Sequence, residues 1–271
     1  MNELGPPPTR TVLRCEALVV PKGRASECED AHAWNAHRAA VCDGASRAFA
    51  SGRWATVLAQ EFLVTELDRS GENETRVLDG WLAQIRRRWA EQTASATDVP
   101  VYVRDALARG SAATFLGVET HDLSSDRPGA TPFLEYRAFA VGDSCLFHLR
   151  DGWPVEVFPL DRAEQFDTHP ALVPTRAELL GSLERVLRLT SGVCGPDDTL
   201  LLATDALAEW ALRSAGECSG VWTFLEGADE TEFDARVRDL REQRMMTSDD
   251  VSLIRCRAVS TASHAADGVA R

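Results

Sequence analysis

The alternation of apolar and polar residues predicts strands near both ends of the chain and helices between them. Residues 11–20 alternate and are rich in β-branched side chains, which is typical of a strand. Between residues 54 and 89, apolar side chains recur mostly every four positions, which is the spacing of amphipathic helices. The helical stripes consist of Trp54, Leu58, Phe62 and Leu67, followed by Val77, Trp81, Ile85 and Trp89.

Further strands are predicted where short apolar runs are bounded by turn residues. They cover residues 33–42, 113–119, 134–141, 144–150, 155–159, 186–190, 199–204 and 251–257. Gly142-Asp143 and Asp151-Gly152 are predicted to be hairpin turns. Two later helices are predicted at residues 206–213 and 230–244. Groups of strands that alternate with groups of helices favour an α+β fold, with antiparallel sheets and helices packed outside, over a doubly wound fold.

The 271 residues are enough for one large domain or two small ones. We find no internal repeat and no linker long enough to separate two domains. The two ends of the chain lack hydrophobic periodicity. The sequence therefore predicts one domain over residues 11–258, with flexible tails at residues 1–10 and 259–271.

The balance of charge argues against two classes of partner. With 29 basic and 42 acidic residues the net charge is −13, so the surface repels nucleic-acid phosphates and anionic membranes. No apolar run approaches the roughly 18–20 residues of a membrane span, and no secretory signal is visible at the N-terminus. The seven cysteines are scattered without a Cys-x-x-Cys pair, which predicts reduced thiols in the cytoplasm. Lys22 is the only lysine, and the sequence pattern assigns it no role.

Several familiar chemistries lack their motifs in this sequence. It contains no nucleotide-binding G-x-x-x-x-G-K-[ST] or G-x-G-x-x-G loop, no H-E-x-x-H zinc motif and no G-x-S-x-G nucleophile elbow. No cysteine is followed six positions later by an arginine, which is the spacing that a cysteine phosphatase loop needs. These absences exclude thiol-based phosphate chemistry and leave the carboxylates as the candidate reactive groups.

Four aspartates stand at the ends of predicted strands. Asp43, Asp143 and Asp205 follow apolar runs, and Asp249 precedes one. If these strand ends meet, the carboxylates converge and repel one another unless a cation neutralises them. Hard oxygen ligands select magnesium or manganese. Taken singly, each site favours an ordinary turn over a metal ligand, since Asp-Gly commonly follows a strand and 42 acids place some at strand ends by chance.

Taken in order, the segments around these aspartates resemble the motifs of the metal-dependent serine/threonine protein phosphatases of type 2C, the PPM family. The resemblance covers roughly residues 24–254, and the segments are most similar to those of a divergent bacterial branch of the family. The segments that carry it are Gly23-Arg24 with Glu29-Asp30-Ala31, Val41-Cys42-Asp43-Gly44, Gly110-Ser111-Ala112-Ala113-Thr114, Val141-Gly142-Asp143-Ser144 with Arg150-Asp151-Gly152, Leu202-Ala203-Thr204-Asp205, and Asp249-Asp250-Val251-Ser252.

The resemblance implies a four-layer αββα sandwich and a centre of two Mn²⁺ or Mg²⁺ ions. In that centre Asp43 bridges both ions and the Gly44 carbonyl binds the first. Asp205 and Asp249 complete the second ion. For Asp143 two roles stay open, as the ligand of a third, weaker ion or as the cap of its hairpin.

The resemblance also implies hydrolysis of phosphoserine or phosphothreonine in proteins by a metal-activated water. Glu29 and Asp30 would orient the water shell, and Arg24 would bind phosphate. The chain departs from the family at Ala45 and Ala206, and Arg24 lies one residue further from Glu29 than the common spacing. Two alternatives therefore stay open, a regulatory or binding module with little or no activity and a phosphatase of a small phosphorylated metabolite. A cognate kinase is a further expected partner.

Overall fold

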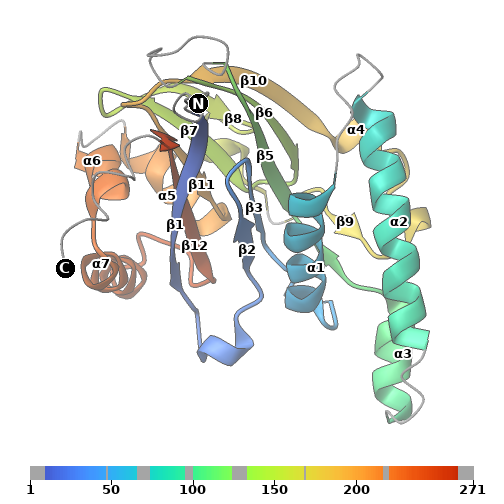
Figure 1. Cartoon of the computed structure of the whole chain (residues 1–271). Helices are drawn as coiled ribbons and strands as arrows, with labels where there is room; N and C mark the ends of the chain where they lie inside the picture. The colour runs from blue at the N-terminus through green and yellow to red at the C-terminus, as the bar shows by residue number, and fades with distance from the viewer. Residues whose placement is uncertain are drawn as a thin grey trace, which may run out of the picture.

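Two five-stranded antiparallel sheets form the centre of the protein (Figure 1). The computed structural model describes residues 10–46, 48–65, 74–94, 100–123, 133–167, 169–215 and 220–261. The first sheet has the strand order β1 (Thr11–Val20), β12 (Val251–Ser260), β11 (Thr199–Ala203), β7 (Cys145–Arg150) and β8 (Trp153–Phe158). The second has the order β10 (Arg188–Cys194), β6 (Leu134–Val141), β5 (Phe115–Asp122), β3 (Arg38–Cys42) and β2 (Ala31–Trp34).

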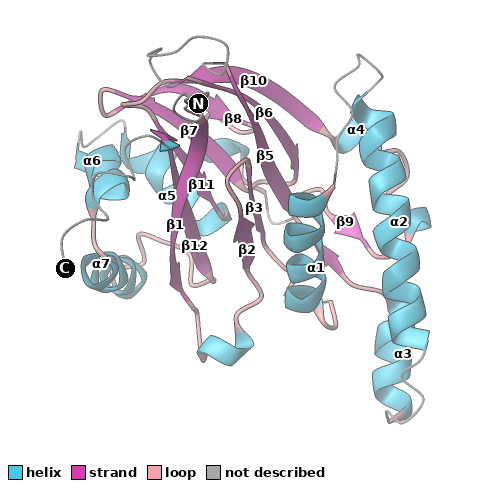
Figure 2. Ribbon diagram, in the orientation of Figure 1, coloured by secondary structure: helices cyan, strands magenta, loops and turns pink. Residues whose placement is uncertain are grey.

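Helices cover the outer face of each sheet, so the described chain has four layers (Figure 2). The first sheet is covered by α5 (Asp205–Ala215), α6 (Gly220–Gly227) and α7 (Glu230–Glu242). The second is covered by α1 (Ser51–Val64) and α2 (Glu74–Ala94), and α3 (Val101–Arg109) and α4 (Leu183–Val186) lie near the two ends of α2. The smaller elements are the paired strands β4 (Ala112–Ala113) and β9 (Val173–Pro174) and the one-turn helices η1 (Ala25–Glu27), η2 (Ala163–Gln165) and η3 (Ala177–Leu179).

Strand β11 shows why some of the chain reads as a continuous apolar run. All five of its residues are buried. Leu200 and Leu202 point into the core between the two sheets, whereas Leu201 and Ala203 point into the core under α5–α7. A strand with both faces buried has no polar face and therefore loses the alternation of a surface strand.

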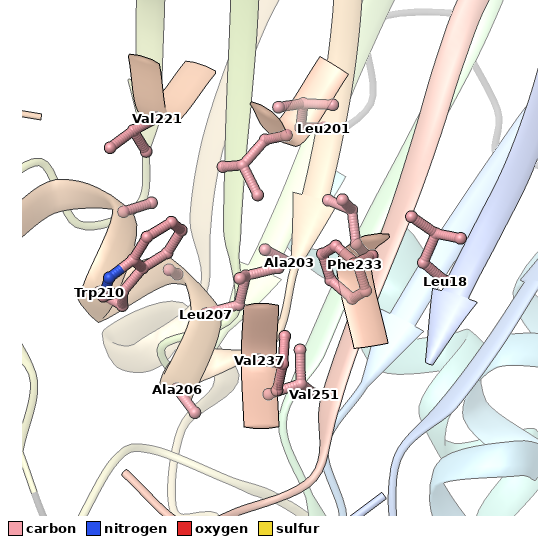
Figure 3. Close-up of a cluster of buried hydrophobic side chains, with 14 of the residues drawn as sticks. Leu18, Leu201, Ala203, Ala206, Leu207, Trp210, Val221, Phe233, Val237 and Val251 are labelled. Atoms are coloured by element: carbon pink, nitrogen blue, oxygen red, sulfur yellow. The ribbon is translucent and has the colours of Figure 1, made fainter. Parts of the chain in front are cut away.

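The core under α5–α7 joins residues that are far apart in the sequence (Figure 3). Trp210 of α5 and Phe233 and Val237 of α7 belong to one buried cluster with Leu201 of β11 and Val251 of β12. Trp210 is buried and belongs to this core. This packing fixes the ends of β11 and β12 relative to each other.

The strand predicted over residues 33–42 is wrong as a single element. The chain turns back after Trp34, and β2 and β3 form a hairpin. The side-chain Oδ1 of Asn35 accepts the backbone N–H groups of His37 and Arg38, each at 2.9 Å, and this turn ends β2. Asparagine stabilises turns in this way because its side chain satisfies neighbouring backbone donors.

The hairpin predicted at Gly142-Asp143 is also wrong. Strands β6 and β7 on either side of it belong to different sheets, so this segment is a connection between the two sheets. Gly142 has φ +112°, and a Cβ there would lie 2.7 Å from Thr114 Cγ2, so the position requires glycine. The hairpin predicted at Asp151-Gly152 is confirmed, since β7 pairs with β8.

The ends of the described chain are paired with each other. Strand β12 continues to Ser260, beyond the boundary expected at residue 258, and Thr261 N–H donates to the Arg10 carbonyl at 2.8 Å. The rest of both expected tails lies outside the described residues, as does Leu67. Helix α6 was not predicted from the sequence. Among the described residues, no helix combines the length and the apolar character that a membrane crossing needs.

Candidate metal centre

The predicted aspartates come together where the ends of strands from both sheets meet. Asp43 follows β3 of the second sheet, whereas Asp205 follows β11 and Asp249 precedes β12 of the first. The carboxyl group of Asp43 interacts electrostatically with those of Asp205 and Asp249, and also with those of Asp30 and Asp143. The fold therefore brings into one volume all five predicted aspartates.

Burial and mutual repulsion shift the titration of these carboxyl groups. Loss of hydration raises the pKa of Asp43 well above its ordinary value, and the neighbouring aspartates raise it further. Burial likewise raises the pKa of Asp30 and of Asp143 to about 7 and that of Asp205 to about 6. Such a cluster gives up its protons readily only when a cation replaces them.

Two carboxylate oxygens of the cluster are suited to such a cation. Asp30 Oδ1 and Asp143 Oδ1 are buried and accept no well-formed hydrogen bond from the described residues, although the Ser252 hydroxyl lies near enough to Asp30 to lower its pKa. The other oxygen of Asp30 accepts the Thr204 hydroxyl at 3.1 Å. Buried polar atoms are normally paired, and unpaired carboxylate oxygens are the ligands that Mg²⁺ and Mn²⁺ prefer. The donor set of this structure therefore fits a hard divalent cation.

The backbone around Asp43 is held on two sides. Asp43 N–H donates to Thr114 Oγ1 at 3.0 Å, and Thr114 N–H donates to the Asp43 carbonyl at 2.8 Å. At Gly44 a Cβ would lie 2.7 Å from the Glu29 carbonyl oxygen and 2.8 Å from the Ser51 carbonyl carbon. Since both neighbours are backbone atoms, only glycine allows this loop to pack so closely against the segment that carries Glu29.

Glu29 and Asp30 have different surroundings although they are adjacent. Glu29 accepts the Ser51 hydroxyl at 2.5 Å and the Lys22 ammonium at 3.0 Å. Burial alone would raise the pKa of Glu29, but these hydrogen bonds outweigh it and the pKa is lowered. Glu29 is thus a paired carboxylate, while Asp30 belongs to the repelling cluster.

Asp143 lies in the connection between the two sheets and is buried. Its electrostatic neighbours are Asp205 and Asp167 as well as Asp43. The expectation that it caps a hairpin fails because no hairpin forms there. Its unpaired, buried oxygen leaves a role as a cation ligand open.

Two charged residues of the centre were missed from the sequence. Lys22 Nζ lies 2.9 Å from Asp249 Oδ1 and 3.0 Å from Ser46 Oγ, in addition to its contact with Glu29. Asp250 is buried and accepts the backbone N–H groups of Lys22 at 2.7 Å and Glu29 at 2.9 Å. Two features of the sequence could have pointed to these residues: Lys22 is the only lysine of the chain, and positions 249 and 250 are both aspartate.

Arg24, predicted to bind phosphate, is exposed at the start of η1. This one-turn helix belongs to the β1–β2 connection, drawn in blue below β1 and β2 in Figure 1. The structure places Lys22 in the cluster and shows no contact of the Arg24 side chain with it among the described residues.

Comparison with known proteins supports the fold assignment. No family model and no curated protein matches the chain. Among solved structures, it is similar to the catalytic domain of the serine/threonine protein phosphatase PstP in complex with two manganese ions, with 17% identity, a TM-score of 0.54, and coverage of 92% of this chain and 99% of that chain. It is also similar to PppA, a regulatory component of T6SS in Pseudomonas aeruginosa, with 20% identity, a TM-score of 0.52, and coverage of 93% and 100%.

A third similar structure is the serine/threonine phosphatase Stp1 from Staphylococcus aureus, with 14% identity, a TM-score of 0.54, and coverage of 90% of this chain and 94% of that chain. The matches extend over nearly the full length of each partner, so they concern the whole sandwich and not one motif. The chain therefore has the phosphatase 2C-like αββα fold that its motifs predicted.

Proposed function

We propose that the protein is a metal-dependent phosphomonoester hydrolase that acts on phosphoserine or phosphothreonine in proteins. One observation carries the proposal: five aspartates from both sheets converge, and two of their buried oxygens, on Asp30 and Asp143, accept no well-formed hydrogen bond from the described residues. The fold shared with serine/threonine phosphatases supports the same reaction. The free thiols of the described cysteines agree with a cytoplasmic setting, in which a cognate kinase would supply the substrate.

Asp43, Asp205 and Asp249, with the Gly44 carbonyl, are the residues that would hold two Mn²⁺ or Mg²⁺ ions, and Asp143 would hold a third. Such ions supply Lewis acidity to a water molecule and to the phosphate group. Asp30 keeps one oxygen free while Thr204 holds the other, so it can orient that water and accept its proton.

The remaining residues of the centre keep the carboxylates in place. Ser51 and Lys22 fix the Glu29 side chain, and Asp250 fixes the backbone on which Glu29 stands. Thr114 fixes the backbone of Asp43 from the second sheet. Preorganisation of this kind lowers the cost of assembling the charged site at the moment of reaction.

The test is hydrolysis of a phosphoserine peptide and of p-nitrophenyl phosphate with Mn²⁺, with Mg²⁺ and with EDTA. We expect activity that depends on the added metal, and a loss of about 10²–10³-fold or more in Asp43→Asn. Asp234→Asn, which removes an acid from the exposed surface of α7, is the matched control and should retain activity. Full activity of Asp43→Asn, or activity that persists in EDTA, would refute the proposal.

A regulatory module with little turnover is the second candidate, and the contact of the Lys22 ammonium with Asp249 favours it. It predicts metal-independent behaviour and no hydrolysis of either substrate. Activity on the small ester alone, with none on peptides, would instead indicate a phosphatase of a small metabolite.

A further inference from the structure

The only lysine of the chain has its ammonium group inside the carboxylate cluster. Lys22 Nζ contacts Asp249 Oδ1 at 2.9 Å, Glu29 Oε2 at 3.0 Å and Ser46 Oγ at 3.0 Å. A second oxygen of the same segment, Asp250 Oδ2, lies 3.7 Å away. An ammonium has three N–H donors, so these three close contacts use all of its hydrogen-bonding capacity.

The backbone holds the Lys22 side chain in this position. Lys22 N–H donates to Asp250 Oδ1 at 2.7 Å, directly beside the residue that the ammonium contacts. The two preceding carbonyls, of Val20 and Pro21, accept hydrogen bonds from the Arg241 guanidinium at 2.8 Å and 3.0 Å. The lysine therefore stands at a fixed point between β1 and β12, with 30% of its side chain exposed.

The carboxylate oxygens of the cluster therefore differ in whether a positive charge of the chain contacts them. The unpartnered buried oxygens belong to Asp30 and Asp143, whereas Asp249 Oδ1 already carries a cation from the chain itself. A divalent ion that uses Asp249 must therefore compete with this ammonium.

We propose that Lys22 acts as an internal cation at Asp249, so that one divalent ion binds readily to the cluster and a second binds only by displacing the lysine. The inference rests on the proposed function only in that the cluster is taken as a site for divalent cations. Lys22 is thereby a positioning residue that sets how many metal ions bind. The sequence had suggested only Arg24 as a functional cation in this segment.

The expected size of the effect follows from the contacts that a second ion must break. Each hydrogen bond to a charged group that a second ion must break weakens the binding of that ion by about tenfold to a hundredfold. Because Lys22 is partly exposed, we take the lower end of this range. The second Mn²⁺ should therefore bind the wild-type protein at least about tenfold more weakly than a variant that lacks the ammonium.

The experiment is calorimetric titration of the metal-free, full-length protein with MnCl₂, for the wild type and three variants. Lys22→Met keeps the length of the side chain and removes its charge, and Lys22→Arg keeps the charge. Arg14→Gln removes one positive charge from an exposed position of β1 and serves as the matched control. Electron paramagnetic resonance on the same samples detects the coupling between two neighbouring Mn²⁺ ions, and circular dichroism checks that each variant is folded.

We expect wild type, Lys22→Arg and Arg14→Gln to bind one Mn²⁺ tightly and a second at least about tenfold more weakly, if at all. Lys22→Met should bind two and show the coupled spectrum at lower manganese concentration. If wild type and Lys22→Met bind two ions with equal affinities, the inference is wrong and the proposed function stands. If no variant binds Mn²⁺, both are wrong.

Discussion

Asp250 and Asp249 are adjacent acids, but we expect mutation of Asp250 to destabilise the protein strongly and mutation of Asp249 to change its stability little. The Asp250 side chain is 1% exposed and that of Asp249 is 30% exposed. Asp250 accepts two backbone N–H groups, from Lys22 at 2.7 Å and Glu29 at 2.9 Å, and so ties the β1–β2 connection to the start of β12. Asp249 Oδ1 accepts a partly exposed ammonium at 2.9 Å and the N–H of the adjacent Asp250 at 2.8 Å, and its carboxylate lies among repelling carboxylates.

The magnitude follows from these contacts. A hydrogen bond to a charged group contributes about 1.5–3 kcal/mol, and a buried donor left without its acceptor costs about 1–3 kcal/mol. Asp250→Ala removes both acceptor oxygens, so we expect the free energy of unfolding to fall by about 3–5 kcal/mol. Asp250→Asn keeps one acceptor oxygen and should cost about half as much. Asp249→Asn breaks one exposed ion pair and relieves repulsion, so it should change stability by less than about 1 kcal/mol.

Urea unfolding in EDTA, followed by circular dichroism, measures these differences without any contribution from bound metal. Equal slopes of the transitions would show that the same surface is exposed in all variants. A cost of less than about 1 kcal/mol for Asp250→Ala, or an equal cost for Asp249→Asn, would show that Asp250 does not hold the β1–β2 connection in this way.

Two further predictions concern the titration of the cluster and the core beneath it. Burial raises the pKa of Asp143 to about 7 and of Asp205 to about 6, above unfolded values of about 4, so the folded protein binds more protons than the unfolded chain between these limits. In EDTA the free energy of unfolding should therefore fall as the pH rises from about 4 to 7, and excess Mn²⁺ should remove this fall. Urea titrations at several pH values measure the effect. Stability that rises with pH in EDTA would contradict the prediction. Trp54 is fully buried, and its Nε1 donates to the Val173 carbonyl at 2.8 Å. Trp54→Phe should therefore lower the free energy of unfolding in urea by about 2–3 kcal/mol. Trp153 is 56% exposed, so the control Trp153→Phe should cost less than about 0.5 kcal/mol.

Local patterning was enough to predict most elements of the fold. The strand expected at residues 11–20 is β1, and Trp54, Leu58 and Phe62 lie on the buried face of α1. Periodicity of this kind depends on the geometry of one segment against one buried face, which the sequence contains directly. The hairpin at Asp151-Gly152 was predictable for the same reason, because its pairing is between immediate neighbours in the chain.

The prediction was wrong where a segment's structure depends on its partners. Residues 33–42 were read as one strand, but Asn35 turns the chain so that both halves pair in the second sheet. Gly142-Asp143 has the composition of a hairpin turn, yet β6 and β7 pair with different strands. A turn sequence specifies local backbone geometry and does not specify which sheet the next strand joins.

By itself, the sequence determined the positions of four of the five aspartates at strand ends and, through the ordered motifs that also include Asp30, the fold that these strands make. Only the tertiary structure decided which charges meet there. Lys22 and Asp249 are 227 positions apart in the chain, and Lys22 instead of Arg24 lies in the cluster because Asp250 holds its backbone against β12. Contacts over such separations arise from the packing of whole sheets, whose energy is spread over many residues, so no local spacing encodes them.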